Sequence, residues 1–466
     1  MEAKNLAQQQ TGSSVSELIA DWSANLKYED LPESVKAIVT KVVLDGAGLM
    51  VAARNEDYVK AIVCSSDSSG SCTALGHENG FSASDAAFIN GTAAHGEDYD
   101  DTAEGSPMHA GGAVGLPTLF AVAERYELSG EKLMLGIAAC IELSCRLAVV
   151  APTAQHRASF HPTAVLGCFG ATLGSSVSLG LNEKQTVNAL GTAGSLAAGI
   201  IEYLGDGSWT KRMHPGWNAQ AGLRAALLGQ AGFFGPKYVF EGEHGAFTAF
   251  AHPDIEQDFG KVTKDLGSNW VADKITFKSY ACGTMTQPFI DCALRLRDEG
   301  VDPNAIEKIE CNVGEGTVHR LWEPLELKQN IPTPYAGKFS VPYCIGISFA
   351  EGAAGLIQFT QEKYKNPIAT EIARKVFYVV DPNNEYPANY TGHLKAVMKD
   401  GTVHEYMQPH MRGGPAEPLT EEELTYKFRA NCEYGGWDHS LANQLQDFCL
   451  GIAALKNLKG LSAFRI

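Results

Sequence analysis

Hydrophobic side chains recur at every third or fourth position over most of the first 270 residues, the spacing of helices with one buried face. Glycine, alanine and serine are frequent within these patterns from residue 110 to 232, and small residues let helix backbones approach closely. The pattern therefore predicts a compact bundle of helices at 16–26, 32–44, 56–64, 83–94, 112–123, 131–149, 162–179, 183–200 and 219–231.

The pattern changes near Asp273, where apolar and polar residues begin to alternate. A period of two is typical of strands with one buried face. Asp400-Gly401 fits a hairpin turn, because Asp-Gly supplies the positive φ angles that such a turn needs. Strands are predicted at 274–277, 309–313, 376–380 and 393–398, with a helix at 287–297 and a return to helical spacing at 419–461.

The predicted fold class is mainly α: a large all-helical domain with an inserted, smaller α+β lid domain. The first part of the helical domain covers residues 1–273, the lid covers 274–408, and the C-terminal return covers 409–466. A chain of 466 residues is longer than a single hydrophobic core usually supports, so a division of this kind is expected. Residues 1–14 are polar and predict a frayed tail.

Charge and hydropathy narrow the classes of partner. The formal net charge is −17, whereas nucleic acids and anionic membranes attract basic surfaces. No uninterrupted apolar run reaches about 18 residues, the length of a membrane span, and the N-terminus lacks the apolar core of a signal peptide. We therefore expect no nucleic-acid partner, no membrane partner and a cytoplasmic location, with a mitochondrial one left open.

The sequence lacks the usual metal and cofactor motifs. Its 11 cysteines are scattered without zinc-site spacing, which predicts buried free thiols in a reducing compartment. It contains no dinucleotide-binding or phosphate-binding glycine loop, no nucleophile elbow and no His-Glu-x-x-His stretch. We therefore expect a site with no metal and no cofactor.

An acidic stretch stands between two apolar helix patterns. Glu97, Asp98, Asp100 and Asp101 fall within five residues, and His109 follows eight residues later. The stretch fits either a solvated loop or a loop that holds a reacting side chain rigidly between two packed helices.

Further polar groups interrupt the helical region. His161 precedes a predicted helix start, where unpaired backbone N–H groups favour a carboxylate ligand; a helix cap or a buried, hydrogen-bonded histidine fits the same position. Lys211, Arg212 and His214 form the densest positive cluster of the chain, at a Gly-rich helix entry. That cluster fits either close approach of an anion or a solvated helix start.

Two polar groups occur in the second predicted domain. Lys278 ends its first strand, a position more typical of a solvated lysine, and a lone tyrosine such as Tyr343 more often packs in a core. Together with the histidines, these residue types suit proton transfer beside carboxylates, because lysine holds an anion while histidine or tyrosine moves a proton.

Taken in order, these stretches resemble the MmgE/PrpD family over about residues 15–460. The family includes 2-methylcitrate dehydratases, cis-aconitate decarboxylases and an iminodisuccinate epimerase. The resemblance implies a large helical domain with an α+β lid, usually in a homodimer. The matching stretches are Asn90-Gly91-Thr92-Ala93-Ala94-His95-x-x-Asp98-Tyr99-Asp100-Asp101-Thr102 with His109, Phe160-His161-Pro162-Thr163, Thr210-Lys211-x-Met213-His214-x-Gly216 and Lys278-x-Tyr280.

The resemblance also implies a cofactor-independent enzyme for a small anionic carboxylate, and it implies roles for particular residues. His109 would donate or accept a proton at carbon, supported by Asp98, Thr102 and Tyr343. The substrate carboxylates would be bound by His161, Lys211 and Lys278, and we add His214, from the same positive cluster, as a candidate for substrate binding.

The reaction is left open by departures from the family's branches. His109 is followed by Ala110, where decarboxylases tend to have proline, and Thr102 by Ala103, where dehydratases tend to have tryptophan. The first interpretation is a lyase that decarboxylates or dehydrates a di- or tricarboxylate. The second is an epimerase or isomerase that exchanges a proton in the same pocket. The third is a non-catalytic carboxylate-binding protein.

Overall fold

A computed structural model describes residues 12–105 and 107–466 of the chain. The fold class is mainly α, with 56% helix, 8% strand and a small mixed sheet in the C-terminal region, which confirms the predicted class. Most of the tail expected over residues 1–14 lies outside the described residues.

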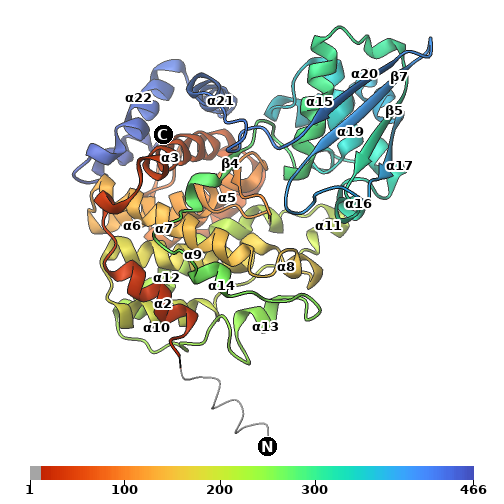
Figure 1. Cartoon of the computed structure of the whole chain (residues 1–466). Helices are drawn as coiled ribbons and strands as arrows, with labels where there is room; N and C mark the ends of the chain where they lie inside the picture. The colour runs from red at the N-terminus through yellow and green to blue at the C-terminus, as the bar shows by residue number, and fades with distance from the viewer. Residues whose placement is uncertain (1–11, 106) are drawn as a thin grey trace, which may run out of the picture. The chain divides into compact units, whose positions relative to one another are not determined.

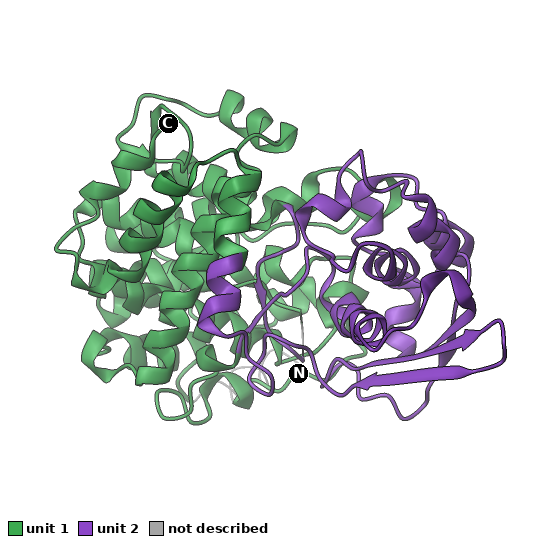
Figure 2. Cartoon of the chain, turned by 90° about the horizontal axis from the view of Figure 1, so that it is seen from above, with its two compact units in different colours: residues 1–96, 106–274, 427–466 green, residues 97–105, 275–426 purple. Residues whose placement is uncertain are grey.

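The chain forms two compact units (Figure 2). Unit 1 comprises residues 1–96, 106–274 and 427–466, and unit 2 comprises 97–105 and 275–426. The sequence placed its domain boundaries after residues 273 and 408. The compact units change over after 274 and 426, and the acidic stretch belongs to unit 2.

Unit 1 is built from helices (Figure 1), together with a short antiparallel pair, β1 (Cys72–Thr73) with β2 (Gly80–Phe81). Helix α21 (Glu421–Tyr434) begins in unit 2 and ends in unit 1. The other helices of unit 1 are α2 (Val15–Ala24), α3 (Glu33–Ala53), α4 (Asp57–Ser65), α5 (Ala83–Gly96), α6 (Leu116–Tyr126), α7 (Gly130–Ala148), α8 (Ala154–Arg157), α9 (Pro162–Leu179), α10 (Glu183–Ala193), α11 (Tyr203–Asp206), α12 (Thr210–Gln230), α13 (Ala246–Phe250), α14 (Gly260–Thr263) and α22 (His439–Leu450).

Small residues bring the central helices of unit 1 into close contact, as the sequence predicted. Helix α12 packs against α5 and α9, and α9 packs against α7. A Cβ atom added to Gly91 of α5 would lie 2.6 Å from the Cα atom of Gly216 in α12, which is too close for any side chain. The crossing of α5 and α12 therefore depends on glycine at both positions.

Several predicted helix boundaries were wrong. Helix α3 continues to Ala53 rather than ending at 44. Helix α10 ends at Ala193 rather than near residue 200, because Gly199 has a φ of +149°, which no helix accommodates, and its carbonyl accepts from the His161 N–H group. Helix α12 begins at Thr210 rather than at 219. It continues through Pro215, which removes one helical hydrogen bond; packing of α12 against its neighbours offsets that cost.

One described helix, α9, is long and apolar enough by composition to span a membrane. Within the protein, 89% of that helix is buried, and buried core helices commonly have such a composition.

Unit 2 contains a four-stranded mixed sheet with the strand order β6-β5-β7-β8. Strand β5 is parallel to β6 and antiparallel to β7, and β7 and β8 form the predicted hairpin around Asp400-Gly401. The strands are β5 (Ile306–Val313), β6 (Val376–Val380), β7 (Gly392–Met398) and β8 (Val403–Gln408), and the helices are α15 (Gln287–Asp298), α16 (Glu315–Leu321), α17 (Leu325–Gln329), α18 (Pro334–Gly337), α19 (Val341–Glu351) and α20 (Pro367–Ala373).

The core of unit 2 follows the alternation seen in the sequence. Ile309, Cys311 and Val313 of β5 are buried together with Leu394 and Ala396 of β7, while the intervening residues are more exposed.

The acidic stretch joins unit 2 through a separate short antiparallel pair, β3 (Asp101–Thr102) with β4 (Thr276–Phe277). Asp101 pairs with Phe277, and Thr102 pairs with Thr276. The strand predicted at 274–277 therefore pairs with the acidic stretch. This pairing places the stretch next to Lys278, the residue that follows β4.

Candidate active site

In unit 1, His109 is held just before a widened helical turn. Gly111–Gly115 forms a π-helical turn, in which the Gly115 N–H group donates to the Ala110 carbonyl at 2.9 Å. Such turns are frequent at functional sites, because they displace the backbone from regular helical positions. The His109 N–H group donates to the hydroxyl of Thr163 at 3.1 Å, which ties this histidine to the first turn of α9.

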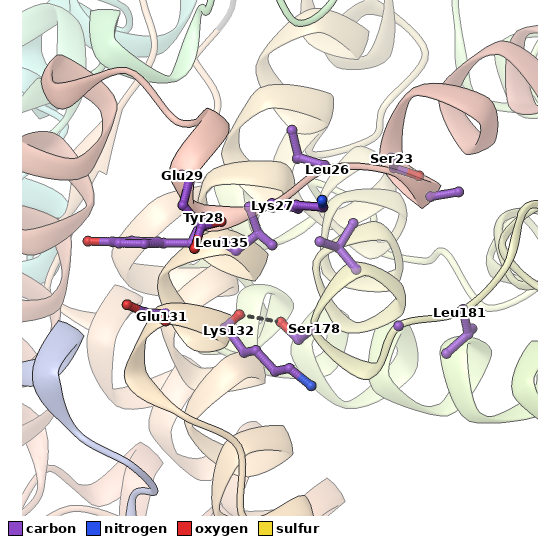
Figure 3. Close-up of a pocket in the computed structure, with 13 residues that line it drawn as sticks. Ser23, Leu26, Lys27, Tyr28, Glu29, Glu131, Lys132, Leu135, Ser178 and Leu181 are labelled. Atoms are coloured by element: carbon purple, nitrogen blue, oxygen red, sulfur yellow. Dashed lines mark hydrogen bonds between the residues drawn. The ribbon is translucent and has the colours of Figure 1, made fainter.

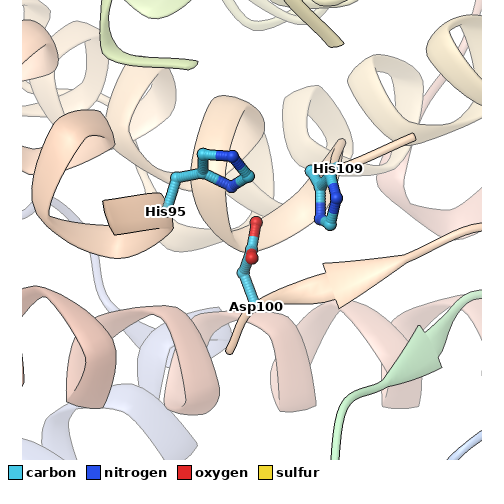
Figure 4. Close-up of side chains that lie close together, drawn as sticks. All are labelled: His95, Asp100 and His109. Atoms are coloured by element: carbon cyan, nitrogen blue, oxygen red, sulfur yellow. The ribbon is translucent and has the colours of Figure 1, made fainter. Parts of the chain in front are cut away.

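His95 lies beside His109 and was not among the predicted site residues. It comes from the last turn of α5 and is fully buried, and its ring centroid lies 4.8 Å from that of His109 (Figure 4). One signal in the sequence pointed to it: His95 stands two residues before Glu97, the first residue of the acidic stretch.

The first turns of α12 provide Lys211 and His214, which are three residues apart and therefore share a helix face. The Lys211 Nζ atom lies 3.1 Å from His95 Nε2, and His214 Nδ1 lies 3.3 Å from Nδ1 of His161, the residue that precedes α9. All four side chains are buried. The helix face thus brings together three of the predicted residues with His95.

Burial lowers the pKa of His161 well below 6.5, and the nearby Lys211 ammonium lowers it further. Burial also lowers the pKa of His214, to about 3. Both imidazoles are therefore neutral near neutral pH. A hydrogen bond between their Nδ1 atoms requires one of these atoms to carry a proton and the other to accept it.

Arg212 does not belong to this cluster, although it stands between Lys211 and His214 in the sequence. Its guanidinium group lies 4.2 Å from the ring centroid of Tyr58, and it is buried there. Successive residues of a helix point about 100° apart. The side chains of Lys211, Arg212 and His214 therefore do not all point in the same direction.

In unit 2, Lys278 is fully buried and contacts the acidic stretch, so the solvated strand end considered from the sequence is wrong. Its Nζ atom donates to the Asp98 carbonyl at 2.9 Å and lies 3.7 Å from the Asp98 carboxylate and 3.8 Å from the Asp100 carboxylate. Asp98 has a φ of +54°, a conformation that costs a residue other than glycine roughly 1 kcal/mol or more.

A second buried lysine holds the start of the same stretch. Lys338 donates to the carbonyls of Glu97 and Ala281 at 2.8 and 3.0 Å, and it forms an ion pair with the Glu97 carboxylate at 2.9 Å. All four acidic side chains of the stretch are buried. The solvated-loop interpretation of the acidic stretch is therefore wrong.

The remaining predicted residues of unit 2 have different surroundings. The Tyr343 hydroxyl donates to the Gln358 carbonyl at 2.7 Å within a buried setting, and burial raises the pKa of that tyrosine. Tyr335, which was not predicted, places its hydroxyl 3.2 Å from the Asp98 carboxylate. The buried Thr102 hydroxyl has no hydrogen-bond partner among the described residues.

A separate cavity of about 300 Å³ lies in unit 1 (Figure 3). Its wall includes Lys27 and Glu29 after α2, Glu131 and Lys132 of α7, and Ser178 of α9, whose hydroxyl donates to the Lys132 carbonyl at 2.8 Å. None of the predicted site residues lines this cavity.

The sequence is similar to cis-aconitate decarboxylases along most of its length. It is 25% identical to that of Aspergillus terreus over 98% of this chain and 97% of the relative. It is 28% identical to that of Mus musculus, with 90% and 86% covered, and 29% identical to that of Homo sapiens, with 76% and 73% covered.

Family models give the same grouping. The MmgE/PrpD N-terminal domain matches residues 17–258, and the MmgE/PrpD C-terminal domain matches residues 280–446. Together the two matches cover most of the chain, with the N-terminal domain first and the C-terminal domain second. The protein belongs to the MmgE/PrpD family.

Proposed function

We propose that the protein is a cofactor-independent lyase that removes CO₂ from a small unsaturated tricarboxylate such as cis-aconitate. The observation that carries the proposal is a buried cluster in unit 1. It contains Lys211 and His214 of α12, His95 of α5, His109 before the π-helical turn and His161 before α9. The similarity to cis-aconitate decarboxylases supports the choice of substrate class.

The cluster provides the two functions that such a decarboxylation needs. Lys211, His161 and His214 bind a substrate carboxylate, and His109 carries the proton. The bond between the methylene carbon and its carboxylate breaks, CO₂ leaves, and the electron pair forms a new double bond to the central carbon. The pair from the old double bond delocalises onto the adjacent carboxylate, and a proton from His109 is added at the alkene carbon.

For unit 2, we propose that Lys278 binds a carboxylate group, that Asp98 and Thr102 orient polar groups, and that Tyr343 supports them. The ion pairs of Lys278 with Asp98 and Asp100 support a fixed position for its ammonium group. The buried hydroxyl of Thr102, without a partner among the described residues, fits a group that awaits a ligand.

Incubation with cis-aconitate, citrate, 2-methylcitrate and iminodisuccinate tests the proposal. We expect CO₂ release and a new alkene product from cis-aconitate or a close analogue. Gas detection measures the CO₂, and NMR identifies the alkene. The whole range from about pH 5 to pH 9 should be covered, because histidines titrate within it. Alkene formation without CO₂ would indicate a dehydratase, and a change of chirality without loss of mass would indicate an epimerase. The absence of CO₂ and alkene over the whole range would refute the lyase.

Binding of a tricarboxylate should be accompanied by proton uptake. Because His161 and His214 are neutral in the unoccupied protein, an anion placed beside them favours their charged forms and raises their pKa values. Binding should therefore take up protons rather than release them. The number of protons taken up should grow as the pH falls from about 8 to 6, towards the ordinary histidine range.

Calorimetric titration with propane-1,2,3-tricarboxylate, in two buffers that differ in ionisation enthalpy, measures this uptake. We expect a fraction of one proton per chain in the wild-type protein and less in His214→Phe, which lacks the paired imidazole. Proton release, or a binding enthalpy that does not depend on the buffer at any pH in this range, would contradict the prediction.

A further inference from the structure

His95 makes two contacts that link different parts of the cluster. Its Nε2 atom lies 3.1 Å from the Lys211 ammonium nitrogen, and its ring lies edge-on to that of His109 at a centroid distance of 4.8 Å. The His95 side chain is fully buried. The same residue therefore contacts the proposed carboxylate-binding cation and the proposed proton carrier.

We propose that His95 is a positioning residue that fixes the Lys211 ammonium group for the substrate carboxylate. This inference rests on the proposed function. An ammonium group has three donors and no acceptor, so the short contact requires His95 Nε2 to accept. His95 must then be neutral, with its ring proton on Nδ1.

Helix geometry makes the pairing of these two side chains rigid. Gly91 lies four residues before His95 in α5, and Gly216 lies five residues after Lys211 in α12; the two glycines meet where the helices cross. A backbone crossing without side chains between the helices fixes the separation of residues one turn away. The acceptor therefore reaches the lysine without a flexible segment between them.

Burial gives this hydrogen bond its function. The buried Lys211 side chain has little contact with water, which would otherwise solvate the ammonium group. The imidazole nitrogen replaces one water molecule and directs one N–H bond, so the remaining N–H bonds have defined directions. A buried hydrogen bond to a charged group is more stabilising than a hydrogen bond between two neutral groups.

Three substitutions separate this role from simple packing. His95→Phe keeps a ring of similar size but has no acceptor. His95→Gln can place an amide oxygen near the position of Nε2. His95→Asn is polar but too short to reach Lys211. His244→Phe, at an exposed histidine of unit 1, provides the control, and we expect it to leave all the measurements unchanged.

We expect His95→Phe and His95→Asn to raise KM for the substrate about 10- to 100-fold, the effect of one lost hydrogen bond to a charged group, with a smaller fall in kcat. His95→Gln should recover most of the KM. Affinity for propane-1,2,3-tricarboxylate, measured by calorimetry, should follow KM. This measurement does not depend on turnover. Thermal unfolding shows which variants remain folded. If His95→Phe does not fold, the comparison of His95→Gln with His95→Asn tests the role of His95 instead.

Two results would overturn the inference. One is a KM and tricarboxylate affinity of His95→Phe within twofold of wild type. The other is an equal loss in the glutamine and asparagine variants. A wild-type protein that binds the tricarboxylate but releases no CO₂ would refute the proposed reaction alone, and the binding comparison would then still decide the role of His95. A wild-type protein that neither binds nor reacts would overturn both.

Discussion

Replacement of His109 by alanine should lower kcat about 100- to 10,000-fold, the usual contribution of a positioned acid or base, while the affinity for propane-1,2,3-tricarboxylate changes by less than tenfold. His109 touches the cluster through its ring, whereas Lys211, His161 and His214 provide the proposed anion contacts. The loss should therefore fall on the chemical step. Steady-state kinetics and calorimetry on the same preparation measure the two quantities.

His109→Gln is the matched variant, because it keeps a buried polar side chain but cannot transfer a proton near neutral pH. We expect it to be as inactive as the alanine variant. His244→Ala, at an exposed position, should have wild-type turnover. Turnover of His109→Ala within threefold of wild type would exclude a role for His109 in proton transfer.

Lys278→Met should destabilise unit 2 by about 3–5 kcal/mol, the usual effect of removing one partner from a buried ion pair. Lys278 lies within 3.8 Å of two buried carboxylates, those of Asp98 and Asp100, and donates to the Asp98 carbonyl. Methionine has a similar length but no charge, so both carboxylates would remain buried without this cation. The loss should appear as faster hydrogen exchange in peptides from 97–105 and 275–426.

Two comparisons make the stability test specific. Lys308→Met removes the lysine of a partly exposed pair with Glu310 in the same unit, and such pairs contribute about 0–1 kcal/mol. The double variant Lys278→Met with Asp98→Asn removes one of the unpaired charges and should regain part of the lost stability. A loss below about 1 kcal/mol in Lys278→Met, the range of exposed pairs, would show that the buried pair does not stabilise unit 2.

Local patterns in the sequence predicted most of the secondary structure. The helix at 162–179 was placed with its observed bounds, and the strand at 376–380 was too. The predictions failed where a distant partner decides the local structure, as at Gly199, whose carbonyl accepts from His161, and at Pro215, which packing retains within α12.

Sequence motifs also selected residues that the structure brings together, but not all of the surrounding contacts. His161, Lys211 and His214 do meet in unit 1, and Lys278 does contact Asp98 in unit 2. The partners His95 and Tyr335 were not predicted, because the residues that they contact lie 116 and 237 positions away in the chain. The catalytic and binding roles of all these residues stay predictions.

By itself, the sequence determined the fold class, the helical and α+β character of the two regions, and the family. These properties depend on periodicity and on ordered short motifs, which are local features of a chain. Only the tertiary structure decided that Lys211 meets His95, 116 residues away, while Arg212 contacts Tyr58 instead. The physical reason is that such contacts depend on the angle and distance at which helices cross, which at Gly91 and Gly216 the absence of two side chains sets.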